Sequence, residues 1–128
     1  MHVYTGFTVK MLWALIDHPA GLSTPELTAL VAHPGPHQRA LTRCGNRLRE
    51  QEGHRVRRAG VTPGAYQRGP AVVWRITEAG ACDVLRLILD DLRKATSVSE
   101  IKKLGADAQR VIAALGFICA EDRQEASA

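Results

Sequence analysis

The hydrophobic period of this chain changes twice, and the two changes limit the folds that it can adopt. Up to Gly53 the apolar residues recur at helical spacing, and between 54 and 77 they alternate as in strands. From Thr77 onward the helical spacing returns. Two alternating runs around a turn-rich segment form a hairpin. The order therefore predicts a mainly helical α+β protein with one small antiparallel β-hairpin.

Two helices are predicted before the first change of period. The first spans residues 8–17, and the turn HPGP (33–36) ends the second. Ser23 and Glu26 form a capping box at the start of the second helix, because each can satisfy a backbone amide of the other. The expected buried positions are Val9, Leu12, Leu15 and Ile16 in the first helix, and Leu22, Leu27, Leu30 and Val31 around the second.

A third helix is predicted over residues 36–52, with Gly53 just after its end. At 100° per residue, its core side and its outer side carry different residues. The core side holds Leu41, Cys44 and Leu48, and the outer side holds Arg39, Thr42, Arg43 and Asn46. Gly45 costs about 1 kcal/mol relative to alanine inside a helix. It indicates either a close approach of the second helix or a local distortion.

The hairpin is predicted to consist of a strand over 54–59, a turn-rich loop over 60–69 and a strand over 70–77. Trp74 is expected to pack this sheet onto the first helix. Thr77 then begins a fourth helix with a wide apolar face. That face is made of Val84, Leu85, Leu87, Ile88, Leu89 and Leu92.

Positive charge is concentrated in one segment of the chain. The whole chain carries +4, but residues 39–75 contain nine arginines and two glutamates, a net charge of +7. A basic segment of this kind indicates a polyanionic partner. The alternative is a solvated face held by salt bridges, and the shortage of nearby acids weakens it.

Two stretches, RLREQEGHRVRR (47–58) and VVWRITEAG (72–80), carry a resemblance to a known family. The pattern is similar to that of MarR-like and PadR-like bacterial regulators, which have a winged helix-turn-helix fold. The resemblance implies a DNA-binding domain over residues 1–95, with a recognition helix at 36–52 in the major groove and a basic wing at 54–77. The chain departs from the pattern in its proline-rich HPGP turn and its long wing loop.

The predicted DNA contacts fall into two groups. Planar donors and acceptors on the outer side of a helix can read base edges in the major groove, whereas arginines on a hairpin suit the phosphate backbone or the minor groove. The base-reading group is Gln38, Arg39, Thr42, Arg43 and Asn46. The backbone group is Arg47, Arg55, Arg57, Arg58 and Arg68.

The last third of the chain contains a further amphipathic segment. A helix is predicted over residues 96–119, with Ser99 as its cap, followed by a patternless, mobile tail at 120–128. Its narrow apolar stripe is Ile101, Leu104, Ala108, Val111, Ile112 and Leu115. This stripe either folds back onto the fourth helix or pairs with a second chain. Pairing is the preferred reading, because two-fold dimers place two recognition helices about 34 Å apart.

Other classes of function lack support in the sequence. The chain has no paired carboxylates or nucleophile–base spacing, and His18, His33, His37 and Cys44 do not share a helical face, so neither catalysis nor a metal or other cofactor is expected. No run is long enough for a membrane span or patterned as a signal peptide. Cys44, Cys82 and Cys119 are interpreted as reduced core residues of a cytosolic protein.

The sequence therefore predicts a sequence-specific double-stranded DNA-binding protein, a dimeric transcriptional regulator located in the cytoplasm at the nucleoid. It gives no indication of an effector ligand. Two alternatives remain open: a winged-helix module that binds proteins, as a scaffold or inhibitor, and a plasmid or phage replication or partition protein.

Overall fold

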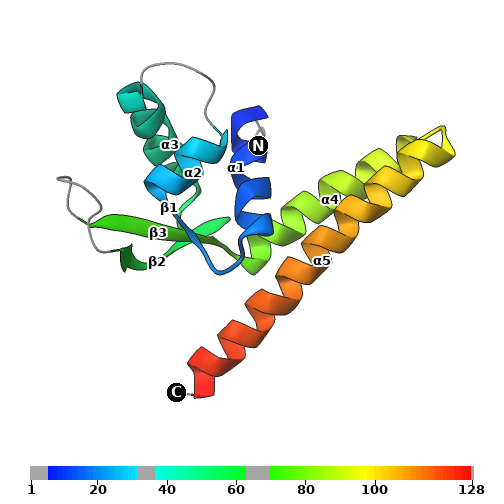
Figure 1. The fold of residues 1–128 in the computed structure, drawn as a ribbon. Helices are drawn as coiled ribbons and strands as arrows, with labels where there is room; N and C mark the ends of the chain where they lie inside the picture. Colours follow the sequence, from blue (N-terminus) through cyan, green and yellow to red (C-terminus); the bar gives the residue numbers. More distant parts are fainter. Residues whose placement is uncertain (1–5, 32–36, 63–69, 128) are drawn as a thin grey trace.

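The computed structural model describes residues 6–31, 37–62 and 70–127. These segments contain α1 (Gly6–Asp17), β1 (Leu22–Ser23), α2 (Thr24–Val31), α3 (His37–Gln51), β2 (Val56–Thr62), β3 (Ala71–Ile76), α4 (Glu78–Lys94) and α5 (Val98–Ser127). Helices α1–α3 gather with the sheet, α4 extends away from them, and α5 runs back beside α4 and continues past its start to the C-terminus (Figure 1). The predicted α+β class is confirmed.

The sheet has three antiparallel strands in the order β1-β3-β2, one more than the predicted hairpin. The additional strand β1 pairs Leu22 with Trp74 and Ser23 with Val73. A two-residue strand is too short to show an alternating pattern, so the sequence signals only the helix start that follows it. β1 fastens the beginning of α2 to the central strand.

The first strand of the hairpin begins and ends later than predicted. β2 runs from Val56 to Thr62, and its pairing with β3 shifts register between Arg58 and Val61. Gly60, inside this irregularity, has a φ of 127°, a conformation that glycine adopts readily. A bulge at glycine therefore carries the strand through a segment predicted as loop.

The capping box at the start of α2 forms as predicted. The Ser23 amide donates to the Glu26 carboxylate at 2.9 Å, and the Glu26 amide donates to the Ser23 hydroxyl at 3.3 Å. These bonds lower the pKa of Glu26. The buried stripe of α2 differs from the prediction, because Leu30 is 57% exposed and Thr28 is buried in its place. Thr28 fits there because its hydroxyl donates to the Thr24 carbonyl oxygen at 2.7 Å.

The core lies between α1, α2, α3, the sheet and the start of α4. Its fully buried residues include Met11, Leu12, Leu15, Leu27, Cys44, Leu48, Val56 and Val84. Trp74 is 3% exposed, and its indole nitrogen donates to the Thr24 hydroxyl at 2.9 Å, which ties the sheet to α2. The expectation that all three cysteines are core residues holds only for Cys44, since Cys82 is half-buried and Cys119 is exposed.

The last helix differs from the prediction at both ends. Ser97, rather than Ser99, caps it, because the Ser97 hydroxyl accepts from the Glu100 amide at 3.1 Å. The helix continues to Ser127, so the prediction of a patternless tail at 120–128 is wrong. Glu121 and Glu125 lie close to arginines of the sheet in this last stretch. These contacts link residues far apart in sequence, which a local pattern does not reveal.

Helix α5 folds back onto its own chain. Val111, Ala114 and Ile118 are buried in the same core as α1 and α4. Arg110 also fastens α5 to α1, because its guanidinium binds Asp17 at 2.6 Å and lies 4.4 Å from the centre of the Trp13 ring. Of the described helices, none has the length and apolar character that a bilayer crossing requires.

Candidate nucleic-acid interface

The outer side of α3 carries the residues that the sequence placed there. Cys44 and Leu48 are fully buried, whereas Arg39 and Asn46 are exposed, as predicted. Thr42 and Arg43 are exposed as well. Leu41 differs from the prediction, because it is only half-buried and lines a groove on the surface. The side chain of Gln38 lies outside the described residues.

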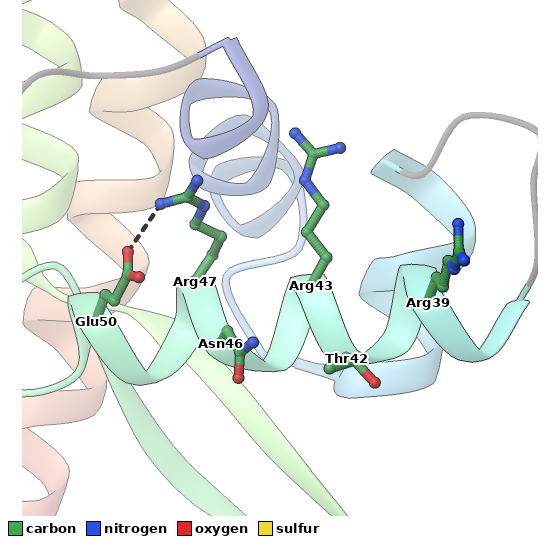
Figure 2. A pocket seen from close by; sticks show the side chains of 6 residues that line it. All are labelled: Arg39, Thr42, Arg43, Asn46, Arg47 and Glu50. Carbon is green, nitrogen blue, oxygen red and sulfur yellow. Dashed lines mark hydrogen bonds and ion pairs between the residues drawn. The ribbon is translucent and has the colours of Figure 1, made fainter.

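Two arginines of this helix project toward α1. Figure 2 shows Arg43 and Arg47 leaving α3 on one side, and Thr42 and Asn46 on the other. The Arg43 guanidinium lies 4.5 Å from the centre of the Phe7 ring of α1, and Arg47 pairs with Glu50 at 3.0 Å. A shallow pocket of about 430 Å³ is lined by Arg39, Thr42, Arg43, Asn46, Arg47 and Glu50. Five of these six side chains can donate a hydrogen bond to an anion.

Arg49 belongs to the same surface, although it is absent from the predicted contact set. Its guanidinium donates to the Asn46 side-chain oxygen, which leaves the amide hydrogens of Asn46 directed elsewhere. Arg49 is exposed and stands seven residues after Thr42, so both lie on one side of the helix. That spacing is a signal in the sequence that could have identified it.

The hairpin arginines do not form one surface, and Arg55 is not a surface residue at all. Only 9% of Arg55 is exposed. Its guanidinium donates to Asp83 of α4 at 2.9 Å and to Gln51 of α3 at 2.7 Å. The prediction that Arg55 contacts the DNA backbone is wrong, because this side chain joins α3, β2 and α4 inside the protein.

Arg57 and Arg75 are partners in the β2–β3 register and point toward α5. Arg57 lies 3.3 Å from Glu125, and the buried Arg75 lies 3.9 Å from Glu121 and donates to the Pro19 carbonyl oxygen at 3.0 Å. The C-terminal part of α5 therefore lies on this side of the sheet and supplies acidic partners to its arginines. Arg57 is engaged there with an acidic partner that the sequence did not reveal.

Arg58 lies on the opposite side of the sheet from Arg57, because successive strand residues alternate. Its guanidinium lies 5.2 Å from the centre of the Trp74 ring and binds Glu52 at 2.7 Å, while 52% of the side chain remains exposed. Arg58 shares a groove with Thr42, Gly45 and Arg49 of α3. Arg68 lies outside the described residues.

The residues predicted to pair two chains also separate into two groups. Val111 is completely buried, and Leu104, Ala108 and Leu115 are partly buried against the core of the same chain. Ile101 and Ile112 remain 49% and 50% exposed. The first group packs inside its own chain, which is one of the two arrangements that the sequence left open. Of the predicted residues, only Ile101 and Ile112 have side chains available to another molecule.

The described structure thus places Arg39, Arg43 and Arg47 at one pocket of α3, and Arg49 and Arg58 at a groove that shares Thr42 with this pocket. Arg55 and Arg57 are separate from both. Comparisons with protein-family models, with curated proteins and with solved structures give no match. The winged-helix resemblance therefore rests on the sequence motifs and stays a prediction.

Proposed function

We propose that the chain is a winged helix-turn-helix protein that binds double-stranded DNA at a specific sequence and regulates transcription without catalysing a reaction. In this proposal α2 and α3 form the helix-turn-helix unit, α3 is the recognition helix, and the β2–β3 hairpin is the wing. The protein acts at the nucleoid of a bacterium, or on the promoters of a phage or plasmid.

The exposed face of α3 is the observation that carries the proposal. A major groove admits one α-helix, and base edges are read there by planar donors and acceptors. Arg39 and Asn46 supply groups of that kind on the outer face, with Thr42 between them. An arginine can pair with guanine in two hydrogen bonds, and an asparagine can do so with adenine. The Arg49–Asn46 hydrogen bond orients the amide before DNA arrives.

The contacts to phosphate differ from those that the sequence predicted. Arg47 stays in the proposed set because it borders the reading face, and Arg58 stays because it is exposed on the α3 side of the sheet. Arg49 joins them. Arg55 leaves the set, and Arg57 contributes little because it faces α5.

A dimer is part of the proposal, but its interface uses a different face of α5 from the one that the sequence predicted. At 100° per residue, one open face of this helix combines exposed isoleucines with glycines that have no neighbouring atom within 4 Å. Its residues are Ile101, Gly105, Ile112, Gly116 and Cys119. Glycines weaken a helix interior, but they let a second helix approach closely. The same face on a second copy is the partner that this stripe fits.

Binding to a random-sequence duplex, followed by fluorescence anisotropy at increasing salt, tests the proposal. Arginine–phosphate contacts release counterions, so the logarithm of affinity should fall linearly with the logarithm of salt concentration. A slope near zero would reject DNA binding and favour the protein-binding module. Sequencing of genomic fragments retained by the protein then separates a regulator from a replication or partition protein, because promoter sites support the first and clustered repeats the second.

A further inference from the structure

A second groove, of about 340 Å³, lies between α3 and the sheet. Leu41, Gly45 and Arg49 line it from α3, and Arg58, Val72 and Trp74 line it from the hairpin. Thr24 of α2 and Thr42 of α3 complete the described lining, which therefore has a guanidinium group on each wall, apolar side chains, two hydroxyl groups and no carboxylate. A groove with that charge is complementary to an anion.

Gly45 is the least explained residue of this groove. It lies in the middle of α3, where glycine is less favourable than alanine. Its φ is not positive, and a Cβ atom there would meet only the Arg49 guanidinium, at 3.6 Å, which is ordinary van der Waals contact. Neither of the two reasons that the sequence allowed applies, since no atom of α2 lies within 4 Å of that Cβ position and α3 is helical on both sides of Gly45. The missing side chain instead keeps the groove open.

The two arginines are held in place on either side of Gly45. Arg58 is stacked on Trp74 and bound to Glu52, and Arg49 is bound to Asn46. Such contacts restrict both guanidinium groups before a ligand arrives, which reduces the ordering that binding requires. The partner of Arg58 is outside the groove lining, so its charge does not close the groove to an anion.

The geometry of DNA identifies the anion. One sugar-phosphate backbone separates a major groove from the adjacent minor groove. A protein that places a helix in the major groove and a hairpin at the minor groove therefore has this backbone between the helix and the hairpin. On the basis of the proposed function, we infer that this backbone runs through the Gly45 groove, with one phosphodiester held between Arg49 and Arg58. Gly45 allows the sugar-phosphate to come close to α3.

Substitution of Gly45 tests the inference, because folding and binding should change in opposite directions. Gly45→Ala and Gly45→Gln should raise the thermal midpoint of unfolding, since both residues favour the helix. Both should weaken binding to specific and random duplex by the same factor, the longer side chain more strongly. Ala106→Gln, an exposed position on α5, is the matched control and should leave DNA affinity unchanged.

Salt dependence gives a second measurement. The variant Arg49→Ala/Arg58→Ala should lower the steepness of the log–log salt slope by about 1, because the two arginines share one phosphate. An unchanged slope, or unchanged affinity of a stably folded Gly45→Gln protein, would overturn the inference while wild-type DNA binding upholds the proposed function. A wild-type protein that binds no DNA would overturn both.

Discussion

Gly80 lies directly against the backbone of Arg55, and a Cβ atom at residue 80 would overlap the Arg55 carbonyl oxygen. The same carbonyl accepts from the Thr77 amide at 3.0 Å, and the Thr77 hydroxyl caps α4 by accepting from the Gly80 amide at 3.0 Å. The ITEAG stretch (76–80) thus joins the end of the hairpin to the first turn of α4. Its glycine is required by close approach rather than by a special φ.

We expect Gly80→Ala to destabilise the fold by about 1–3 kcal/mol, the usual cost of overpacking a well-packed site. The backbone of Arg55 cannot rotate away as a flexible side chain could. Urea unfolding of the variant and the wild type measures the difference. Gly45→Ala provides the comparison, because there the added methyl group has room and stability should rise. Equal stability of Gly80→Ala and wild type would contradict this account.

Asp83→Ala should also destabilise the protein, by about 3 kcal/mol, because it leaves the buried Arg55 guanidinium without its carboxylate. Gln51 still holds Arg55, so the lower end of the range for buried pairs applies. Chemical denaturation measures the loss. The matched variant Arg86→Ala removes a partner of the same carboxylate whose side chain is 76% exposed. It should lower the stability by less than about 1 kcal/mol. Similar losses from both variants would mean that burial does not matter here.

Arg55 also shows where sequence reasoning stops. The Ser23–Glu26 capping box and the two sides of α3 were predictable, because their causes lie within four residues along the chain. The carboxylate partner of Arg55 is 28 residues away and that of Arg57 is 68 residues away, so an arginine in a basic strand looks like a DNA contact until the fold is known. Local periodicity gives the direction of a side chain but not what another element places there.

The candidate site was predictable to a similar extent. The exposed arginines of α3 follow from helical spacing, whereas the groove at Gly45 depends on how α3 sits against β2 and β3. The short strand β1 and the last turns of α5 were missed for the same reason. Both are stabilised by residues distant in sequence rather than by a pattern of their own.

Asn46→Ala should reduce the discrimination between the specific site and random DNA by about 1–3 kcal/mol, the value of a two-hydrogen-bond base contact. Arg57→Ala is the control, because its guanidinium is paired with Glu125 on the other side of the sheet. It should leave both affinities and the salt slope nearly unchanged. Anisotropy with the two duplexes measures both effects. Equal losses on both DNAs from Asn46→Ala would show that α3 does not read bases.

The cysteines should react with a thiol reagent at very different rates. Burial raises the pKa of the Cys44 thiol, which therefore has less reactive thiolate at a given pH as well as less access to reagent. Cys119 is exposed on α5. Iodoacetamide at a dilution at which the proposed dimer is dissociated, followed by peptide mass analysis, should find Cys119 modified first and Cys44 only on unfolding. Early modification of Cys44 would mean that α3 opens readily from the core.

Ile112→Asp should convert the proposed dimer to a monomer, because it places a charge in the middle of the open apolar face of α5. Ile112 is half exposed in the single chain, so the fold should survive the change. Ala113→Asp is the matched control, since the neighbouring residue is exposed but points about 100° away from that face. Sedimentation equilibrium should give twice the 13.9 kDa chain mass for the wild type and Ala113→Asp, and the single mass for Ile112→Asp. Affinity for a two-fold site should fall steeply only in the monomer. If the wild type is already monomeric at the concentration used for DNA binding, this interface does not exist. If the Ile112→Asp protein remains dimeric, the dimer interface lies elsewhere.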